Sequence, residues 1–287
     1  MAIQGTRIRR LVCVIAICGA VLTAAPAIAD EDLEELNLLA DSVEDLEQTP
    51  GAEPVKKAPT WDFRLGVLAG LGPDYEGSSN YEFVAAPYFR IGWKDRIILR
   101  GRSLQANALR TPNLRLGPLA RIRGKRKDDD NDALRGLGDV DTSIEVGGFI
   151  RYRRGPFRFR TLITQDVADG HGGALAEIGV GAQLPLGKPL TLVMVTTSLA
   201  TDDYMKSYFG VNAAQSATSG LRTFKADGGV KDVGLSVSSR FPLSGKWSGL
   251  MVMRYWRLLG DAADSPIVKD KGEENQFLFA VGSVYRF

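Results

Sequence analysis

Hydrophobic and polar residues alternate with a period of two along most of the chain. In the segment WDFRLGVLAGL, which starts at Trp61, the odd positions are apolar, whereas the even positions include Asp62, Arg64 and glycines. The same alternation returns in NYEFVAAPYFRIGW, NLRLGPLARIRG and TSIEVGGFIRYRRG. Side chains of a β-strand point alternately to its two faces, so this pattern predicts strands with one apolar face. No segment between residues 61 and 287 is predicted to be helical.

Ten segments carry the pattern clearly: 61–71, 81–93, 114–123, 142–153, 157–166, 174–184, 189–199, 231–241, 246–257 and 276–287. The less regular stretch 95–110 is expected to fold back near Gly101 into two short strands, which gives an even number of about twelve, with ten as the alternative. A rival count adds a strand at 204–212, but it sends some of the longest polar loops to the side that normally has short turns.

Charged residues occupy the polar face in the middle of these segments. A soluble barrel turns its apolar face inward, whereas a membrane barrel presents it to lipid and keeps charges in the lumen. Three features favour the membrane version: segments of about ten residues, aromatic residues at segment ends, and the character of the last strand. The charges predicted to line the lumen are Arg64, Glu82, Arg90, Arg121, Glu145, Arg151, Arg158, Arg160 and Glu177. The predicted fold is therefore all-β, a transmembrane antiparallel up-and-down barrel.

The aromatic residues at segment ends are expected to form the girdles that flank the lipid-facing band. They are Trp61, Tyr81, Trp93, Trp247, Tyr255, Trp256, Tyr285 and Phe287. In the last segment, QFLFAVGSVYRF, one parity carries Phe279, Val281, Tyr285 and Phe287. This strand resembles the signal by which outer-membrane barrels are handed to their assembly machinery, which is therefore an expected partner, together with outer-membrane lipid and lipopolysaccharide.

The first 29 residues predict a cleaved secretory signal peptide. Three arginines precede an apolar run that begins at Leu11, and small residues end at Ala29. The apolar run is shorter than the ~20 residues of a spanning helix. Cys13 and Cys18 both lie in this segment, so the chain from Asp30 onward has no cysteine for disulfides or thiolate metal sites.

Charge divides the remaining chain into an acidic arm and a moderately basic body. Residues 30–60 contain ten acids and two lysines, which leaves 31 basic and 24 acidic residues in 61–287. Leucines at helical spacing in the arm, followed by prolines and a glycine, predict a short amphipathic helix and a linker on the periplasmic side. The pI of about 8.5 describes the precursor and does not indicate nucleic-acid binding. No nucleic-acid partner is expected.

Motifs for chemistry are weak. His171, the one histidine, lies near Asp166 and Asp169, which leaves a remote alternative of an outer-membrane hydrolase, but no serine stands in a nucleophile motif. An acidic loop segment, KDDDNDALRGLGD, lacks the glycine and glutamate positions of a calcium loop. No catalytic residue, cofactor or metal site is predicted.

Several segments resemble the MipA/OmpV family of Gram-negative outer-membrane proteins, the MltA-interacting proteins. They are GPDYEGSSNYEFVAAPYFRI, DVDTSIEVGGFIRYRRGPF, DVADGHGGALAEIGVG, YFGVNAAQSATSGLRTFKADGGVKDVGLSVSSRF and DSPIVKDKGEENQFLFAVGSVYRF. The resemblance implies a non-enzymatic barrel that acts as a scaffold for a lytic transglycosylase and a murein synthase. It does not extend to the acidic arm. A narrow solute pore or an adhesin-like protein is the alternative.

Overall fold

A computed structural model of the chain describes residues 60–187 and 189–287. The predicted signal peptide and almost all of the acidic arm lie outside these residues. The strands are β1 (Trp61–Pro73), β2 (Tyr81–Trp93), β3 (Ile97–Arg100), β4 (Ser103–Ala106), β5 (Leu109–Arg110), β6 (Leu114–Arg123), β7 (Ser143–Arg154), β8 (Phe157–Asp166), β9 (Ala174–Pro185), β10 (Leu190–Ala200), β11 (Gly229–Pro242), β12 (Trp247–Leu258) and β13 (Asn275–Arg286).

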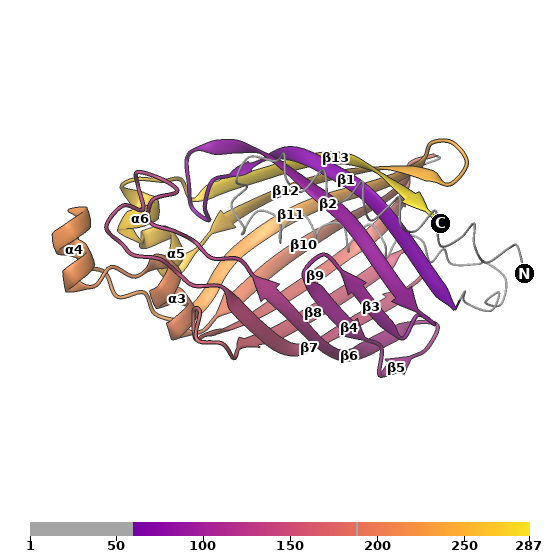
Figure 1. The fold of residues 1–287 in the computed structure, drawn as a ribbon, viewed down its shortest axis with the longest axis horizontal. Coiled ribbons are helices and arrows are strands. Elements are labelled where there is room, and N and C mark those ends of the chain that lie inside the picture. Colours follow the sequence, from indigo (N-terminus) through magenta and orange to yellow (C-terminus); the bar gives the residue numbers. More distant parts are fainter. Residues whose placement is uncertain (1–59, 188) are drawn as a thin grey trace, which may run out of the picture.

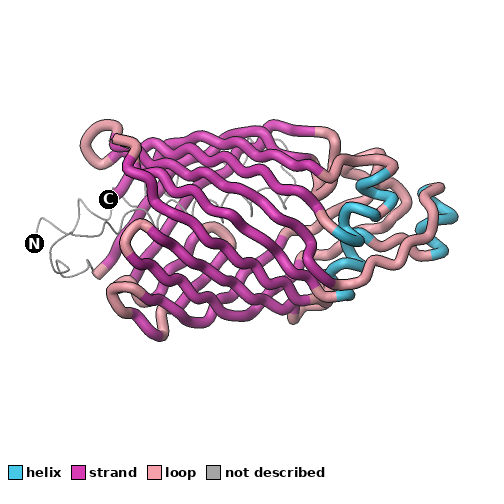
Figure 2. Tube along the Cα trace, turned by 180° about the vertical axis from the view of Figure 1, so that it is seen from behind, coloured by secondary structure: helices cyan, strands magenta, loops and turns pink. Residues whose placement is uncertain are grey.

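These strands form one closed antiparallel barrel (Figures 1 and 2). Strands that are neighbours in sequence pair with each other, except for β4 and β5; β1 pairs with β13, and the β4–β6 pairing closes the wall. Because β4 and β5 both pair with β6, the thirteen strands fill twelve positions, as predicted. The predicted reversal near Gly101 is confirmed: this glycine has a φ of 47°, which L-residues with a side chain rarely adopt.

Short turns lie at one end of the barrel, here called the turn end, and long loops lie at the other, here called the loop end (Figure 1). The turn end holds the start of β1 and the end of β13, while the loop end holds segments 74–80, 124–142, 167–173, 201–228 and 259–274.

Alternation along the strands separates an apolar outer face from a mixed inner face. In β7, Ile144, Val146 and Ile150 are exposed, whereas Ser143, Glu145 and Phe149 between them are buried. Exposed apolar side chains recur on the outward parity of the other long strands. This is the inverted pattern of a membrane barrel, with the apolar face toward lipid.

The inner face itself has two sides. Apolar side chains from β1, β2, β10, β12 and β13 form a buried cluster that includes Leu68, Val84, Leu192, Val252 and Leu278. The arc from β6 to β8 instead carries arginines and Glu145. The arc from β6 to β8 is therefore mainly charged, whereas the opposite arc is mainly apolar but carries Arg64 and Arg90 near the turn end.

Four helices lie in the long loops, so the prediction of no helix after residue 61 is wrong. They are α3 (Asp202–Phe209), α4 (Ala213–Ser219), α5 (Gly260–Asp264) and α6 (Pro266–Lys269). Helix α3 also replaces the strand that the rival count placed at 204–212. With four to eight residues each, these helices are too short to show a helical period clearly. No helix in the described part of the chain is long and apolar enough to span a membrane.

The aromatic prediction holds in part. Trp61, Tyr81, Trp93, Trp247 and Phe287 are exposed near strand ends, as interfacial girdles require. Trp256 is an exception, because only 1% of it is exposed and it packs in the core below the loops. Its even position places it on the inward face of β12. The prediction used only the position at a segment end and did not consider this parity.

Candidate functional site

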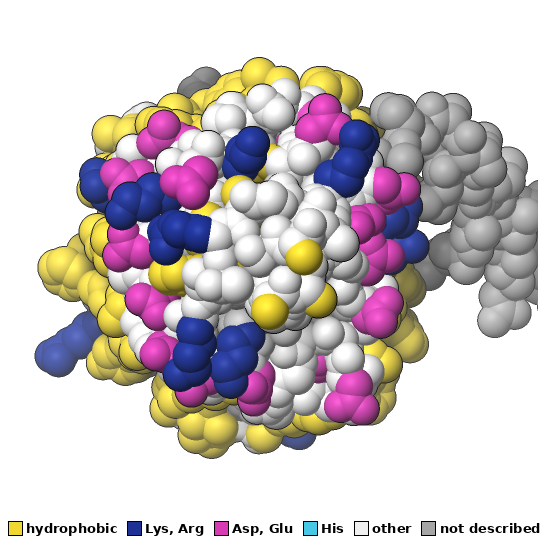
Figure 3. Space-filling model, turned by 90° about the vertical axis from the view of Figure 1, so that its left-hand side faces the viewer, with side chains coloured by type: hydrophobic (Ala, Val, Ile, Leu, Met, Phe, Trp, Pro, Cys, Tyr) yellow, Lys and Arg dark blue, Asp and Glu magenta, His cyan; other side chains and the backbone are white. Residues whose placement is uncertain are grey.

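The loop end is closed by a cap in which four loops pack against one another. Its core contains Tyr204, Phe209 and Trp256, none of which has more than 1% of its surface exposed. A second apolar cluster joins segments 74–80 and 124–142 to it through Tyr75, Leu134, Leu137, Val211, Leu221 and Ile267. The space-filling view of this end shows mainly charged side chains, other polar groups and backbone, with a few apolar side chains among them (Figure 3). Hereafter these loops are called the loop cap.

Polar contacts fix the same loops to each other. Ser265 Oγ donates to the carbonyl oxygen of Phe209 over 2.7 Å, and Gln276 Nε2 donates to that of Ser78 over 3.0 Å. Lys231 forms ion pairs with Glu76 and with Asp232 at the top of β11. A buried lysine needs such partners, because an unpaired charge in a low-dielectric environment is costly. The loop cap is thus held by apolar packing and by buried polar contacts together.

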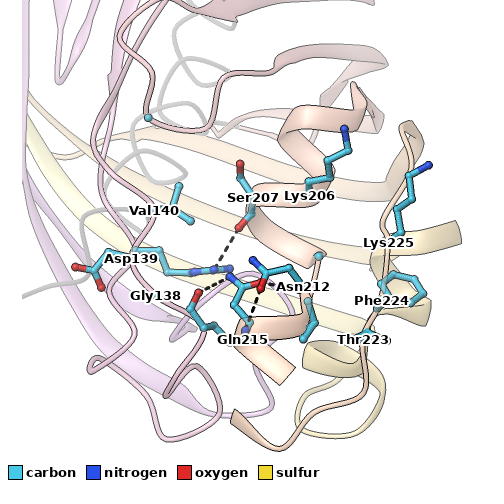
Figure 4. Close-up of a pocket in the computed structure, with 15 residues that line it drawn as sticks. Gly138, Asp139, Val140, Lys206, Ser207, Asn212, Gln215, Thr223, Phe224 and Lys225 are labelled. Carbon is cyan, nitrogen blue, oxygen red and sulfur yellow. Dashed lines mark hydrogen bonds between the residues drawn. The ribbon is translucent and has the colours of Figure 1, made fainter. Parts of the chain in front are cut away.

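A cleft of about 630 Å³ opens in the cap between segment 137–140 and helices α3 and α4 (Figure 4). Its lining mixes apolar and polar residues, and its charged residues are mainly cationic, with Arg126, Lys206 and Lys225 against Asp139. Lys225 pairs with Asp227 over 2.7 Å, which raises the pKa of its ammonium group. Arg126 donates to the carbonyl oxygens of Tyr208 and Ser207, so its guanidinium supports the floor of the cleft.

Helix α4 forms one wall of this cleft for a local reason. Asn212 caps its first turn by accepting from Gln215 N–H over 3.0 Å, while the Gln215 side chain accepts from Asn212 N–H over 2.8 Å. This reciprocal capping box stabilises a helix start. The Gln215 amide also donates to the carbonyl oxygen of Leu137, which ties the helix to the opposite wall.

A buried charge cluster lies below the cap on the charged arc. Glu145, which is fully buried, accepts from Arg121 Nε and Arg123 Nε over 2.6 Å each and from Thr164 Oγ1 over 2.7 Å. Arg121 Nη1 reaches Glu177 on β9 over 3.0 Å, so the cluster crosses four strands on the inner face. Charge-assisted hydrogen bonds of this length are strong and hold these strands in a fixed arrangement.

His171 belongs to this cluster. Its Nε2 lies 3.0 Å from Glu145 Oε1, and its Nδ1 accepts from Gly173 N–H over 3.1 Å. Because Nδ1 accepts, the proton resides on Nε2 and is donated to Glu145. Asp166 accepts backbone N–H bonds from Ala168, His171 and Gly172, so it shapes the loop rather than orienting the imidazole ring. Both ring nitrogens are occupied by hydrogen bonds to Glu145 and to the backbone of Gly173. A general base of a hydrolase needs a ring nitrogen that can accept a proton from the nucleophile, so this arrangement does not fit that role.

All nine charges predicted for the lumen lie on the inward parity of their strands. Arg64, Arg90, Arg121, Glu145 and Arg158 are buried, and Glu82, Arg151, Arg160 and Glu177 are half-buried. The structure joins Arg121, Glu145 and Glu177 in the cluster just described, whereas Arg64 and Arg90 meet at Asp62 near the turn end. A role for these side chains in solute passage stays a prediction.

Sequence reasoning missed several members of these clusters. Asp62 binds Arg64, Arg90 and Arg286, and its even position in β1 was a usable signal. Lys231 and Asp232 are adjacent and yet both buried, because the register of β10 and β11 shifts at Ser198. A bulge of this kind interrupts the alternation on which the prediction relied.

The four residues of the predicted assembly signal lie on the outward parity of β13. Phe279, Val281 and Phe287 are exposed and Tyr285 is half-exposed, packed edge to face against Trp247 with ring centroids 5.1 Å apart. Their recognition by the assembly machinery stays a prediction.

Comparison with known proteins places most of the barrel in one family. Residues 65–287 match the family described as MltA-interacting protein MipA. The MltA-interacting protein of Escherichia coli (strain K12) is 25% identical over 163 residues, which cover 57% of this chain and 64% of that protein. The protein of the same name from Shigella flexneri gives the same values. The chain thus aligns with less than two-thirds of the length of these relatives.

Among solved structures, an outer-membrane channel from Pseudomonas putida F1 aligns with a TM-score of 0.41 and 12% identity, over 82% of this chain and 100% of that one. The outer-membrane protein OprD from Pseudomonas aeruginosa aligns with a TM-score of 0.32 and 13% identity, over 80% of this chain and 65% of that one.

Proposed function

Since the chain belongs to the MipA family of MltA-interacting proteins, we propose that it is a scaffold which holds murein-degrading and murein-synthesising enzymes together at the outer membrane. Its fold is that of an outer-membrane barrel with an apolar outer face. The partners in this proposal are a lytic transglycosylase and a murein synthase. The relatives named as MltA-interacting support the first of these partners.

The loop cap is the observation that favours a scaffold over an open pore. Tyr204, Phe209 and Trp256 fill the loop end, and buried contacts tie the loops to each other. A solute path through this end would require the cap to open. A scaffold needs no such path, because its function lies in the surfaces that it presents.

The turn end supplies the contact surface in this proposal. Short turns of outer-membrane barrels normally face the periplasm, and the murein enzymes act there. In that orientation β1 begins on the periplasmic side, so residues 30–60 extend from the same side. Its ten acids and its leucines at 33, 36, 39 and 46 make this arm the most distinctive periplasmic segment.

A crosslinking pull-down from native envelopes tests the proposal. It compares the mature protein with a variant that lacks residues 30–60 and with a variant in which the acidic side chains of the arm are replaced by their amides. The expected result is recovery of a lytic transglycosylase and a murein synthase with the mature protein and their loss on deletion. Recovery of neither enzyme from any form would refute the scaffold role.

A narrow pore for anionic solutes is the second candidate. The arginines on the inward parity of β6, β7 and β8 favour it, because a lumen lined by one sign of charge selects the opposite sign. The test is ion current through planar bilayers under a salt gradient. A reversal potential of the sign for anion selectivity would support this candidate, and an absence of steady current would exclude it.

A further inference from the structure

The cleft in the loop cap has a size and a position that suit a small ligand from outside the cell. Its volume of about 630 Å³ lies within the usual range of small-molecule sites in proteins. It opens at the loop end, and outer-membrane barrels normally carry their long loops on the outer side. The scaffold proposal places its partners at the turn end, so it gives this cleft no role.

Hydrogen bonds join the walls of the cleft to one another. The backbones of Val211 and Phe224 exchange two hydrogen bonds of 2.8 Å each, which connect segment 223–225 to the residues after α3. The side-chain amide of Gln215 donates to the carbonyl oxygen of Leu137 on the opposite wall. The cleft is thus formed by tied segments rather than by loose loops, and a ligand that enters it has little backbone to order.

The chemical groups along the cleft match a saccharide. Asn212 and Thr223 are exposed and present an amide and a hydroxyl group, and Asp139 presents a carboxylate from the facing wall. Such groups form hydrogen bonds with the hydroxyl groups of a sugar. Phe224 is half-buried, so part of its ring offers an apolar surface to the C–H face of a sugar ring. A Cβ on Gly138 would meet no atom within 4 Å, so the backbone there is open to a ligand.

Two lysines add a preference for an acidic saccharide. Lys206 and Lys225 both line the cleft, and their side chains extend in the same direction in Figure 4. Lys206 pairs with Asp203 over 3.3 Å, and Lys225 pairs with Asp227 over 2.7 Å. All four side chains are exposed, and exposed ion pairs contribute little to stability. A carboxylate or phosphate of a ligand can therefore replace these partners at small cost.

We propose that this cleft is a binding site for an acidic saccharide. Lys206 and Lys225 bind its carboxylate or phosphate group, while Phe224 packs against a sugar ring. Asn212 and Asp139 form hydrogen bonds with its hydroxyl groups. Saccharides of this chemistry reach the outer surface from two sources, the lipopolysaccharide of the same membrane and free molecules in the medium. The inference does not rest on the scaffold function, because it concerns the opposite end of the barrel.

Calorimetric titration of the purified mature protein in detergent tests this site. The probe is trigalacturonic acid; its methyl ester offers the same sugars without the charges, and citrate offers several carboxylates without a sugar. Lys206→Gln combined with Lys225→Gln removes both lysines of the cleft. Lys269→Gln is the matched control, because Lys269 is an exposed lysine of the same cap that pairs with Asp264 over 2.9 Å and stands outside the cleft lining.

We expect trigalacturonic acid to bind at least about tenfold more tightly than its ester or citrate, and the double lysine variant to lose about tenfold in affinity. Lys269→Gln should leave the affinity unchanged, and Asp139→Asn should increase it, because it removes the carboxylate that faces the lysines. Heat-dependent migration on a gel confirms that each variant is folded. No binding of trigalacturonic acid, equal affinity for the ester or citrate, or full affinity in the double lysine variant would overturn the proposal.

The same titration in lipid nanodiscs with and without lipopolysaccharide distinguishes the two sources. Weaker binding of the probe in the presence of lipopolysaccharide assigns the site to the saccharide of the membrane, whereas unchanged binding assigns it to free saccharides. Because no murein enzyme is present, a failure here leaves the scaffold proposal standing. Loss of partners in the pull-down likewise leaves the saccharide site standing.

Discussion

At the loop end, apolar side chains from four loops pack into a core, whereas at the turn end the wall places arginine opposite arginine. Phe209 has no exposed surface in the first region, and Arg151 faces Arg115 and Arg160 in the second. The loop cap is stable through its own contacts. At the turn end, Asp62 lies between Arg64 and Arg90 on neighbouring strands. The same barrel thus combines one end that is held mainly by apolar packing with one whose inner wall is dominated by charged residues.

The largest effect is expected where the two regions meet, at Glu145. We expect Glu145→Gln to lower the free energy of unfolding by about 3–5 kcal/mol, because Arg121 and Arg123 would lose their shared buried carboxylate. Urea unfolding in detergent, followed by tryptophan fluorescence, measures it. Glu177→Gln is the matched control, since Glu177 is half-buried and contacts Arg121 through one 3.0 Å bond. An equal or larger loss of unfolding free energy in the control would contradict the claim that Glu145 holds the charge cluster together.

Phe209→Ala tests whether the loop cap is stable through packing. Removal of this buried ring should destabilise the cap by about 3 kcal/mol, because it leaves a cavity among Tyr204, Trp256 and their neighbours. Limited proteolysis should then cut within 201–228 while the barrel still migrates as a folded species. The control Thr223→Ala changes an exposed residue of the same loop and should leave the cleavage rate unchanged. A resistant Phe209→Ala cap would show that other contacts dominate.

His171 distinguishes a structural role from a catalytic one. We expect His171→Ala to cost about 1–3 kcal/mol of unfolding free energy, because Glu145 loses a donor and Tyr204 loses an edge-to-face contact at 5.0 Å. His171→Gln offers an amide donor and should recover part of the loss. The measurement is the urea midpoint of the three proteins. Lipid or ester hydrolysis by the wild-type protein that disappears in His171→Gln would instead establish the hydrolase alternative.

Arg151→Gln gives the smallest expected effect. The change should raise the unfolding free energy of the mature protein by about 0.5–1 kcal/mol, since it relieves repulsion from Arg115 and Arg160 on the neighbouring strands. The urea midpoints of the wild-type and variant proteins measure the effect. A lower midpoint in the variant would show that the favourable contacts of Arg151 outweigh this repulsion.

Much of the fold follows from alternation alone. The period of two locates the long strands to within a few residues, and the glycine at 101 marks the extra hairpin that makes twelve positions. Parity also identifies which charges point inward, as for Arg64 and Glu145. These features depend on residues close together in the chain, so a single sequence is enough to predict them.

The loop cap and the charge cluster depend on contacts between distant segments. The bond between Gln276 and Ser78 joins residues 198 positions apart, and that between Arg121 and Glu177 spans 56. Nothing in the local pattern specifies such partners. Helix α4 could have been predicted from the local sequence. Asn212 and Gln215 have the spacing of a capping box, which indicates a helix start.

The central claim is that the loop cap closes the barrel, so that the protein acts through its surfaces rather than as a conduit. Single-channel recording of the purified mature protein in planar bilayers tests this most directly. We expect no steady conductance at moderate voltage, both for the full mature protein and for the variant without residues 30–60, because the cap does not depend on the arm. A stable ohmic current through the full mature protein would contradict the account and establish a pore.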